Sequence, residues 1–182
     1  MKRSLFAHVT LAFAVIACGG RAVSIAPADA KTACQAAMKG SSPAACDLIG
    51  TRVTGDRHMT LAGTLAEVPP SGKAALVDFW SVSCAPCVEA MPALQAAASA
   101  GVPVFGVSTD DNPGLVMNTA KARGVSYPIF LDDRGLLRGA FRVGGDLPRL
   151  FVVDATGSVR GVFGGATGSV DRAVALYRAL AR

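Results

Sequence analysis

The feature that most constrains this chain is a pair of cysteines, Cys84 and Cys87, placed between an apolar stretch and a helical pattern. The apolar stretch, Ala75–Trp80, has β character and carries one acid, Asp78. A C-x-x-C pair in this context is typical of a redox centre rather than half of a metal site. A thiol in the first turn of a helix is stabilised as its thiolate by the helix dipole. The spacing therefore predicts a dithiol that cycles with a disulfide.

Composition limits the fold and the partners of the chain. Its 182 residues suit one ordinary domain with a leader, and 51% hydrophobic with 17% charged residues is typical of a globular protein. The formal net charge is +5, but no basic run with interleaved aromatic residues is present. We therefore expect no nucleic-acid partner. We also expect a monomer without a metal and without a cofactor other than the redox-active disulfide.

Residues 1–18 have the pattern of a signal peptide, with a basic start and an apolar stretch too short to span a bilayer comfortably. The sequence Val15-Ile16-Ala17-Cys18 resembles a bacterial lipobox, in which Cys18 would become the lipidated mature N-terminus. Ala28-Asp29-Ala30 fits an ordinary cleavage site instead, which would release a soluble protein after Ala30. An uncleaved apolar N-terminus of a cytosolic protein is a third alternative. We favour the lipobox, and hence a lipid-anchored protein of the periplasm or extracytoplasmic membrane face, because Arg21 interrupts the path to the later site.

Two further cysteines, Cys34 and Cys46, lie in residues 19–50, which are rich in Ala, Ser, Gly and Pro and predict a tether with a short helical piece at 32–38. In an oxidising compartment this pair is expected to form a structural disulfide that closes a small loop. Such a loop contributes on the order of 3 kcal/mol in the chain-entropy account. A second redox pair, or a pair of resolving thiols, is the alternative, although no activating feature surrounds these cysteines.

Residues 51–182 predict a single α/β domain, a central mixed sheet flanked by helices and preceded by a β-hairpin. Its expected hairpin strands are 51–53 and 59–61, around a turn at Gly55-Asp56. The expected sheet strands are 75–80, 102–107, 127–131, 149–153 and 159–163. The expected helices are 86–100 with a kink at Pro92, 113–122, 134–141 and 170–180.

Four motifs carry a family resemblance. They are Val77-Asp78-Phe79-Trp80 leading into Cys84-Ala85-Pro86-Cys87, Met91-Pro92, Gly106-Val107-Ser108-Thr109-Asp110, and Gly145-Asp146-Leu147-Pro148 entering Phe151-Val152-Val153-Asp154-Ala155-Thr156-Gly157. In this combination the chain resembles the thioredoxin superfamily over residues 51–182. Within it, the chain looks most like the exported TlpA/ResA-like thiol:disulfide oxidoreductases. The resemblance implies a thioredoxin-like fold.

The resemblance also implies roles for four residues. Cys84 is the exposed attacking thiol, Cys87 is the buried resolving thiol, and Asp78 takes the proton from Cys87. Burial within an apolar strand should raise the pKa of Asp78, although a capping or edge-exposed acid is the alternative. Pro148 matches the family's cis-proline opposite the disulfide, and an ordinary strand-edge proline is its alternative.

A substrate groove is implied around the disulfide, lined by Trp80, Ser83, Pro86, Leu147, Pro148 and Arg149. Two of these positions depart from the family, because Ser83 replaces the usual Trp and Arg149 the usual Thr. The cation of Arg149 either stabilises the Cys84 thiolate or selects acidic partners, or is simply solvated. Glu89 precedes the position of a frequent family Glu, which here is Ala90, and is expected at the surface.

The chemistry expected from these residues is thiol–disulfide exchange with protein substrates. The resemblance implies reduction of disulfides, fed by a membrane electron donor, while oxidation through a membrane acceptor is the reverse cycle. A thiol peroxidase of the peroxiredoxin type is one alternative, but its Pro-x-x-x-Thr pattern is absent before Cys84. A metal-binding or chaperone module on the same fold is another, with His58 expected to be a surface residue. Val88 after Cys87 excludes a haem-attachment motif.

Overall fold

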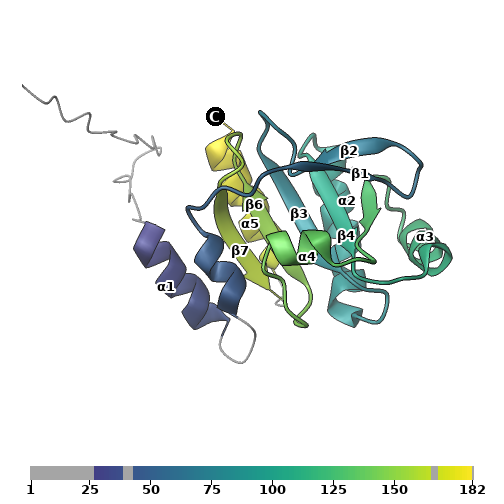
Figure 1. Ribbon diagram of the computed structural model, residues 1–182, viewed down its shortest axis with the longest axis horizontal. Coiled ribbons are helices and arrows are strands. Elements are labelled where there is room, and N and C mark those ends of the chain that lie inside the picture. Colours follow the sequence, from purple (N-terminus) through teal and green to yellow (C-terminus); the bar gives the residue numbers. More distant parts are fainter. Residues whose placement is uncertain (1–26, 39–42, 165–167, 182) are drawn as a thin grey trace, which may run out of the picture.

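The structure, a computed structural model, describes residues 27–38, 43–164 and 168–181. At its centre is a five-stranded sheet in the order β5-β4-β3-β6-β7 (Figure 1). These strands are β3 (Ala75–Trp80), β4 (Val104–Ser108), β5 (Ile129–Leu131), β6 (Arg149–Val153) and β7 (Val159–Gly164). β3, β4 and β5 run parallel, whereas β6 is antiparallel to both of its neighbours. The mixed sheet and the thioredoxin-like fold predicted from the sequence are confirmed.

Helices cover both faces of this sheet. One face packs against α2 (Ala85–Ser99), α3 (Pro113–Ala122) and α5 (Ser169–Leu180), and this layer buries Leu76, Trp80, Leu94, Val116, Leu150 and Ala173. The other face packs against α1 (Pro27–Ala37), the 3-10 helix η1 (Pro43–Leu48) and α4 (Leu136–Ala140). Figure 1 shows α4 in front of the sheet and α5 behind it. On the α4 side, Phe79, Phe141 and Phe151 form an aromatic cluster with ring centroids 4.9–5.7 Å apart.

β3 is buried along its whole length, since all six of its residues are buried. It lies between two other strands and under helices on both faces, which explains its nearly continuous apolar sequence. Alternation along the strand points Leu76, Asp78 and Trp80 to the α2 face and Val77 and Phe79 to the α4 face. The one acid of this strand is therefore forced into the interior beneath α2.

The described part of the N-terminal segment is folded onto the domain, although the sequence suggested a tether. α1 and η1 are joined by a disulfide between Cys34 and Cys46, with the two sulfurs 2.00 Å apart. Both cysteines are buried, and they share the core layer that contains Phe151 and Val162. Ile49 continues this contact through a bridge to Val159 on β7. The segment thus covers the β7 side of the sheet.

A hairpin precedes the main sheet as predicted, but both its strands and its turn lie further along the chain than the expected 51–53, 55–56 and 59–61. Its strands are β1 (Asp56–Met59) and β2 (Leu65–Val68), and the Thr60 N–H donates to the Thr64 carbonyl at 2.8 Å across the turn. Gly63 supplies the positive φ of 77° that this turn needs. Gly55, expected in the turn, instead lies where a side chain would collide with the Pro69 carbonyl. Both positions require glycine, but only Gly63 lies in the hairpin turn.

The strands and helices predicted from residue 75 onward agree with those observed to within two residues, whereas the short helix expected at 32–38 is α1, Pro27–Ala37. α2 continues through Pro92 as one helix, with the proline ring on its exposed side. Within the described residues, no helix has the length and apolar character needed to cross a bilayer. The cleavage and lipidation site proposed at Cys18 lies outside the described residues.

Candidate active site

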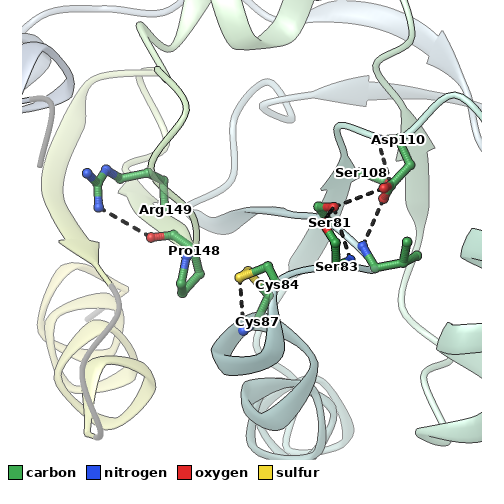
Figure 2. The surroundings of a disulfide bond; sticks show 9 residues. Ser81, Ser83, Cys84, Cys87, Ser108, Asp110, Pro148 and Arg149 are labelled. Atoms are coloured by element: carbon green, nitrogen blue, oxygen red, sulfur yellow. Dashed lines mark hydrogen bonds between the residues drawn. A yellow bond between two sulfur atoms is a disulfide. The ribbon is translucent and has the colours of Figure 1, made fainter.

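A disulfide joins Cys84 and Cys87 at the start of α2, directly after the buried strand β3 (Figure 2). Cys84 is the N-cap residue, and its sulfur accepts a hydrogen bond from the Cys87 N–H at 3.3 Å. Pro86 occupies the first turn, where its missing N–H costs no helical hydrogen bond. Cys84 is partly exposed, whereas Cys87 is fully buried. Only the outer sulfur can therefore meet another protein.

The helix start also favours the thiolate of Cys84 over its thiol. The backbone N–H groups of the first turn carry partial positive charge and point toward the N-cap sulfur. The same N–H that contacts the disulfide can donate to a thiolate after reduction. Burial of Cys87 acts in the opposite direction, because an apolar environment disfavours its charged form. The two thiols are thus chemically distinct, one suited to attack and one needing help to lose its proton.

Asp78 is the acid that the structure places beneath α2. It is only 2% exposed, and its Oδ2 has no hydrogen-bond partner among the described residues. Burial raises the pKa of Asp78 from 3.8 to about 8. An ordinary carboxylate is a weak base toward a thiol of pKa about 8.5, but one with a pKa near that of the thiol exchanges protons with little free-energy difference. The capping or edge-exposed alternative for Asp78 is excluded by its burial.

Pro148 lies beside the disulfide, and the Leu147–Pro148 peptide bond is cis (Figure 2). Both residues are half-buried and immediately precede β6, so the strand fixes their position relative to α2. Ser83 and Pro86, on either side of Cys84 in the sequence, are exposed. Four of the six predicted groove residues therefore lie at the surface around Cys84.

A cleft of about 360 Å³ opens between α2 and α5 next to this surface. Asp78 lines it, together with Pro86, Glu89, Ala90, Ala93, Leu94, Pro148, Leu150, Phe163, Gly168, Ser169, Val170 and Asp171. The cleft therefore links the buried carboxyl group to solvent. The α5 side of this cleft was not predicted from the sequence.

Two predicted groove residues do not face the groove. Trp80 has 0% exposure and belongs to the core beneath α2. Arg149 is 3% exposed, so the solvated alternative is wrong. It is paired with Phe79 across the sheet, and its guanidinium points away from the cysteines in Figure 2.

The buried guanidinium of Arg149 contacts residues of the loop that precedes it. Its Nη1 donates to the Pro148 carbonyl at 3.4 Å, and its Nη2 lies 3.6 Å from the Asp146 carboxylate. Burial lowers the pKa of Arg149, while the charge of Asp146 acts to raise it. Gly164 makes room on β7, because a side chain there would collide with the guanidinium. Through these contacts Arg149 holds the loop that carries Pro148, on the side away from the cysteines. The sequence pattern alone could not tell this buried position from one in the groove.

The loop before Cys84 is held by the carboxylate of Asp110, which the sequence analysis did not single out. Asp110 accepts hydrogen bonds from the Ser81 hydroxyl at 2.9 Å, the Val82 N–H at 3.0 Å and the Ser108 hydroxyl at 2.7 Å (Figure 2). The Ser83 hydroxyl lies 3.0 Å from that of Ser81. Ser83, at the position where a tryptophan is usual, is therefore part of a polar network. This network could have been inferred from the sequence, because polar residues follow the ends of both β3 and β4, two neighbouring parallel strands.

Asp110→Ala is expected to destabilise the fold by about 2 kcal/mol, because it leaves the Ser81, Ser108 and Val82 donors without their charged acceptor. The matched control is Asp111→Ala, which removes the neighbouring, exposed carboxylate. Urea unfolding of the two variants measures the difference. Equal stability of the two would mean that the network does not hold the loop.

The described residues contain no group of three or more His, Cys, Asp or Glu side chains arranged to bind a metal. His58 lies on β1, and its ring and that of Phe130 are nearly perpendicular, with centroids 6.5 Å apart. β1 belongs to the separate two-stranded sheet and lies next to the edge strand β5, whereas the cysteines follow the central strand β3. The described cysteines are paired with one another in two disulfides.

Comparison with known proteins connects this geometry to a family. Residues 57–162 match the sequence model of the AhpC/TSA family. The thiol-disulfide oxidoreductase YkuV of Bacillus subtilis is 34% identical over 104 residues, which cover 53% of this chain and 70% of YkuV. Protein DipZ of Mycobacterium tuberculosis is 38% identical over 98 residues, 49% of this chain, but the chain spans only 14% of DipZ.

The fold has close counterparts among solved structures. A secreted disulfide oxidoreductase of Mycobacterium tuberculosis, described as homologous to Escherichia coli DsbE, superposes with a TM-score of 0.61 at 22% identity. The match covers 69% of this chain and 96% of that one. At this identity the likeness concerns the fold, which is the thioredoxin-like fold derived above. The chain therefore belongs to the AhpC/TSA family, and the thiol-disulfide oxidoreductase YkuV is a relative of it.

Proposed function

We propose that this chain is an exported thiol-disulfide oxidoreductase that reduces disulfides of other proteins through Cys84 and Cys87. One observation carries the proposal. The pair lies at the start of α2 with its outer sulfur accessible and its inner sulfur buried in the layer toward which Asp78 also points. The relationship to YkuV, which is named for this activity, supports the same chemistry.

The proposed reaction has two exchange steps. The Cys84 thiolate attacks one sulfur of a substrate disulfide, forming a mixed disulfide while the other substrate sulfur leaves as a thiolate. Cys87 then transfers its proton to ionised Asp78, and the new thiolate attacks Cys84. This breaks the mixed disulfide, and the second substrate sulfur leaves and takes up a proton. The substrate gains two electrons, and the chain ends with the Cys84–Cys87 disulfide.

A dithiol donor must return the chain to its reduced form. We propose a membrane electron donor for this step, in line with the resemblance to TlpA-like reductases. A membrane acceptor would run the same chemistry toward oxidation. The substrate surface is proposed to include Ser83, Pro86, Leu147 and Pro148, which surround the exposed sulfur.

An extracytoplasmic location fits the second disulfide, because Cys34–Cys46 has the buried position typical of a structural bridge in an oxidising compartment. We propose a lipid anchor at Cys18. α1 begins at Pro27, so processing at Cys18 would leave the helix whole. Cleavage after Ala30 would instead remove its first turn.

The test compares two substrates of the purified dithiol form. The proposal predicts catalytic reduction of insulin disulfides and only slow, non-catalytic consumption of hydrogen peroxide. Rapid peroxide turnover without insulin reduction would favour the peroxiredoxin alternative, which the family name keeps open. Absence of insulin reduction together with tight Cu(I) binding would favour the metal-binding alternative.

A further inference from the structure

Three buried polar groups beneath α2 have no hydrogen-bond partner among the described residues. They are the Asp78 Oδ2, the Trp80 indole N–H and the Tyr127 hydroxyl. The residues that carry them are 2%, 0% and 7% exposed, respectively. Because buried polar groups nearly always find partners, three without one in the same layer need an explanation.

Gly106 explains how these groups come together. It is the residue of β4 directly paired with Asp78 on β3. A Cβ at Gly106 would lie 3.2 Å from the Trp80 Nε1 and 3.2 Å from the Tyr127 Cε2. The rings of Trp80 and Tyr127 therefore meet over Gly106, the β4 residue paired with Asp78.

The chemistry of the three groups is complementary. The indole N–H can only donate a hydrogen bond, and the phenol can donate one, whereas a carboxylate only accepts. Donors facing a buried carboxylate favour its ionised form and oppose the effect of burial. Burial raises the pKa of Tyr127, and the negative charge of Asp78 raises it further, so the two groups interact electrostatically.

The charged residues that line the cleft with Asp78 are Glu89 from α2 and Asp171 from α5, and both are acids. The buried titratable groups of this layer besides Asp78 are Cys87 and Tyr127. One cation, Arg172 on α5, lies at the cleft, where its guanidinium donates to the Ser169 hydroxyl at 3.3 Å. Burial raises the pKa of Asp78 and no cation among the described residues acts to lower it, so neutral donors are the groups suited to stabilise its charge.

We propose that Tyr127 and Trp80 are positioning residues whose hydrogen-bond donors reach ionised Asp78 through a buried water, and so prepare it to receive the proton of Cys87. This inference rests on the proposed function, in which Asp78 is the proton acceptor. The proton passes from the Cys87 sulfur to the Asp78 carboxylate and then to solvent through the cleft between α2 and α5. Tyr127 keeps its own proton throughout.

The experiment measures the pKa of Asp78 in the reduced protein from its carboxyl ¹³C shift, assigned with Asp78→Asn. Tyr127→Phe removes only the hydroxyl group. It is expected to raise the pKa of Asp78 and to slow resolution of a preformed mixed disulfide at pH 7 by about three- to tenfold. The difference in resolution rate between Tyr127→Phe and the wild type should disappear at high pH, where Asp78 is ionised in both proteins. Trp80→Phe is expected to act in the same direction through loss of the N–H.

The matched control is Tyr177→Phe on α5, a partly buried tyrosine outside the cleft lining, which should change neither quantity. A wild-type pKa of Asp78 in both Tyr127→Phe and Trp80→Phe would overturn the inference while leaving the proposed function intact. An unchanged resolution rate in Asp78→Asn would instead remove Asp78 from the reaction. The two failures are therefore distinguishable.

Discussion

Cys84→Ser is expected to abolish disulfide reduction, with a loss of turnover of about a thousandfold or more. A serine hydroxyl at neutral pH is not ionised, and the helix start has no thiolate left to stabilise. Cys84 is also the only half of the pair with exposed surface, so no other group can take over the attack. The measurement is the rate of insulin reduction with the dithiol form regenerated by excess reductant.

Cys87→Ser is the matched control for this prediction. It keeps the accessible sulfur and should still consume one equivalent of a disulfide reagent, but it should not complete the cycle. Retained turnover in Cys84→Ser would contradict the assignment of the attacking thiol. Equal loss of the first step in both variants would contradict it as well.

Asp78→Asn is expected to stabilise the oxidised protein at pH 8 by roughly 3 to 5 kcal/mol. The folded-state pKa of about 8 is above the unfolded value of 3.8, so between these pH values the folded protein holds a proton that the unfolded chain has lost. The stability of the wild type therefore falls as pH rises through this window. An asparagine does not titrate, so its stability should stay flat over the same range.

Urea unfolding from pH 4 to pH 8 measures this difference. The gap between variant and wild type should be small at pH 4 and should widen steadily toward pH 8. Other titrating groups contribute equally to both proteins and cancel in the comparison. A gap that does not change with pH would mean that Asp78 has an ordinary pKa in the folded protein.

This expected gain in stability has a functional counterpart. The buried carboxyl group destabilises the fold at neutral and higher pH, yet its raised pKa is what suits it to accept a proton from Cys87. Asp78→Asn should therefore make the protein more stable and its resolving step slower. A residue selected for packing alone would not show the two effects together.

Much of the fold was predictable from the sequence because its strongest signals are local. Continuous apolar runs indicated β3 and β6, and helical spacing after the cysteines indicated α2. The hairpin turn was misplaced because both Gly55 and Gly63 are suitable turn residues. Only the structure shows that Gly55 is needed for close packing against Pro69 instead. The folding of α1 and η1 onto β7 depended on long-range contacts that composition does not encode.

The roles of the cysteines and Asp78 were predictable because a C-x-x-C motif directly after an apolar strand with one acid is typical of a redox centre. Arg149 and Trp80 were assigned to the wrong surroundings, since the face toward which a strand residue points depends on the register of the sheet. Asp110 and Tyr127 were missed because their roles arise only when β3, β4 and the segment before β5 lie side by side. Motif spacing identifies the reacting atoms, whereas their support comes from distant parts of the chain.

The most direct test of the account is to trap the mixed disulfide. Cys87→Ala, reduced and then exposed to a disulfide-containing protein substrate, should accumulate a covalent adduct that excess reductant releases. Peptide mapping by mass spectrometry should locate the linkage at Cys84. A stable adduct at Cys84 is expected in Cys87→Ala, and none is expected in Cys84→Ser. Failure to form an adduct, or a linkage at Cys34 or Cys46, would contradict it.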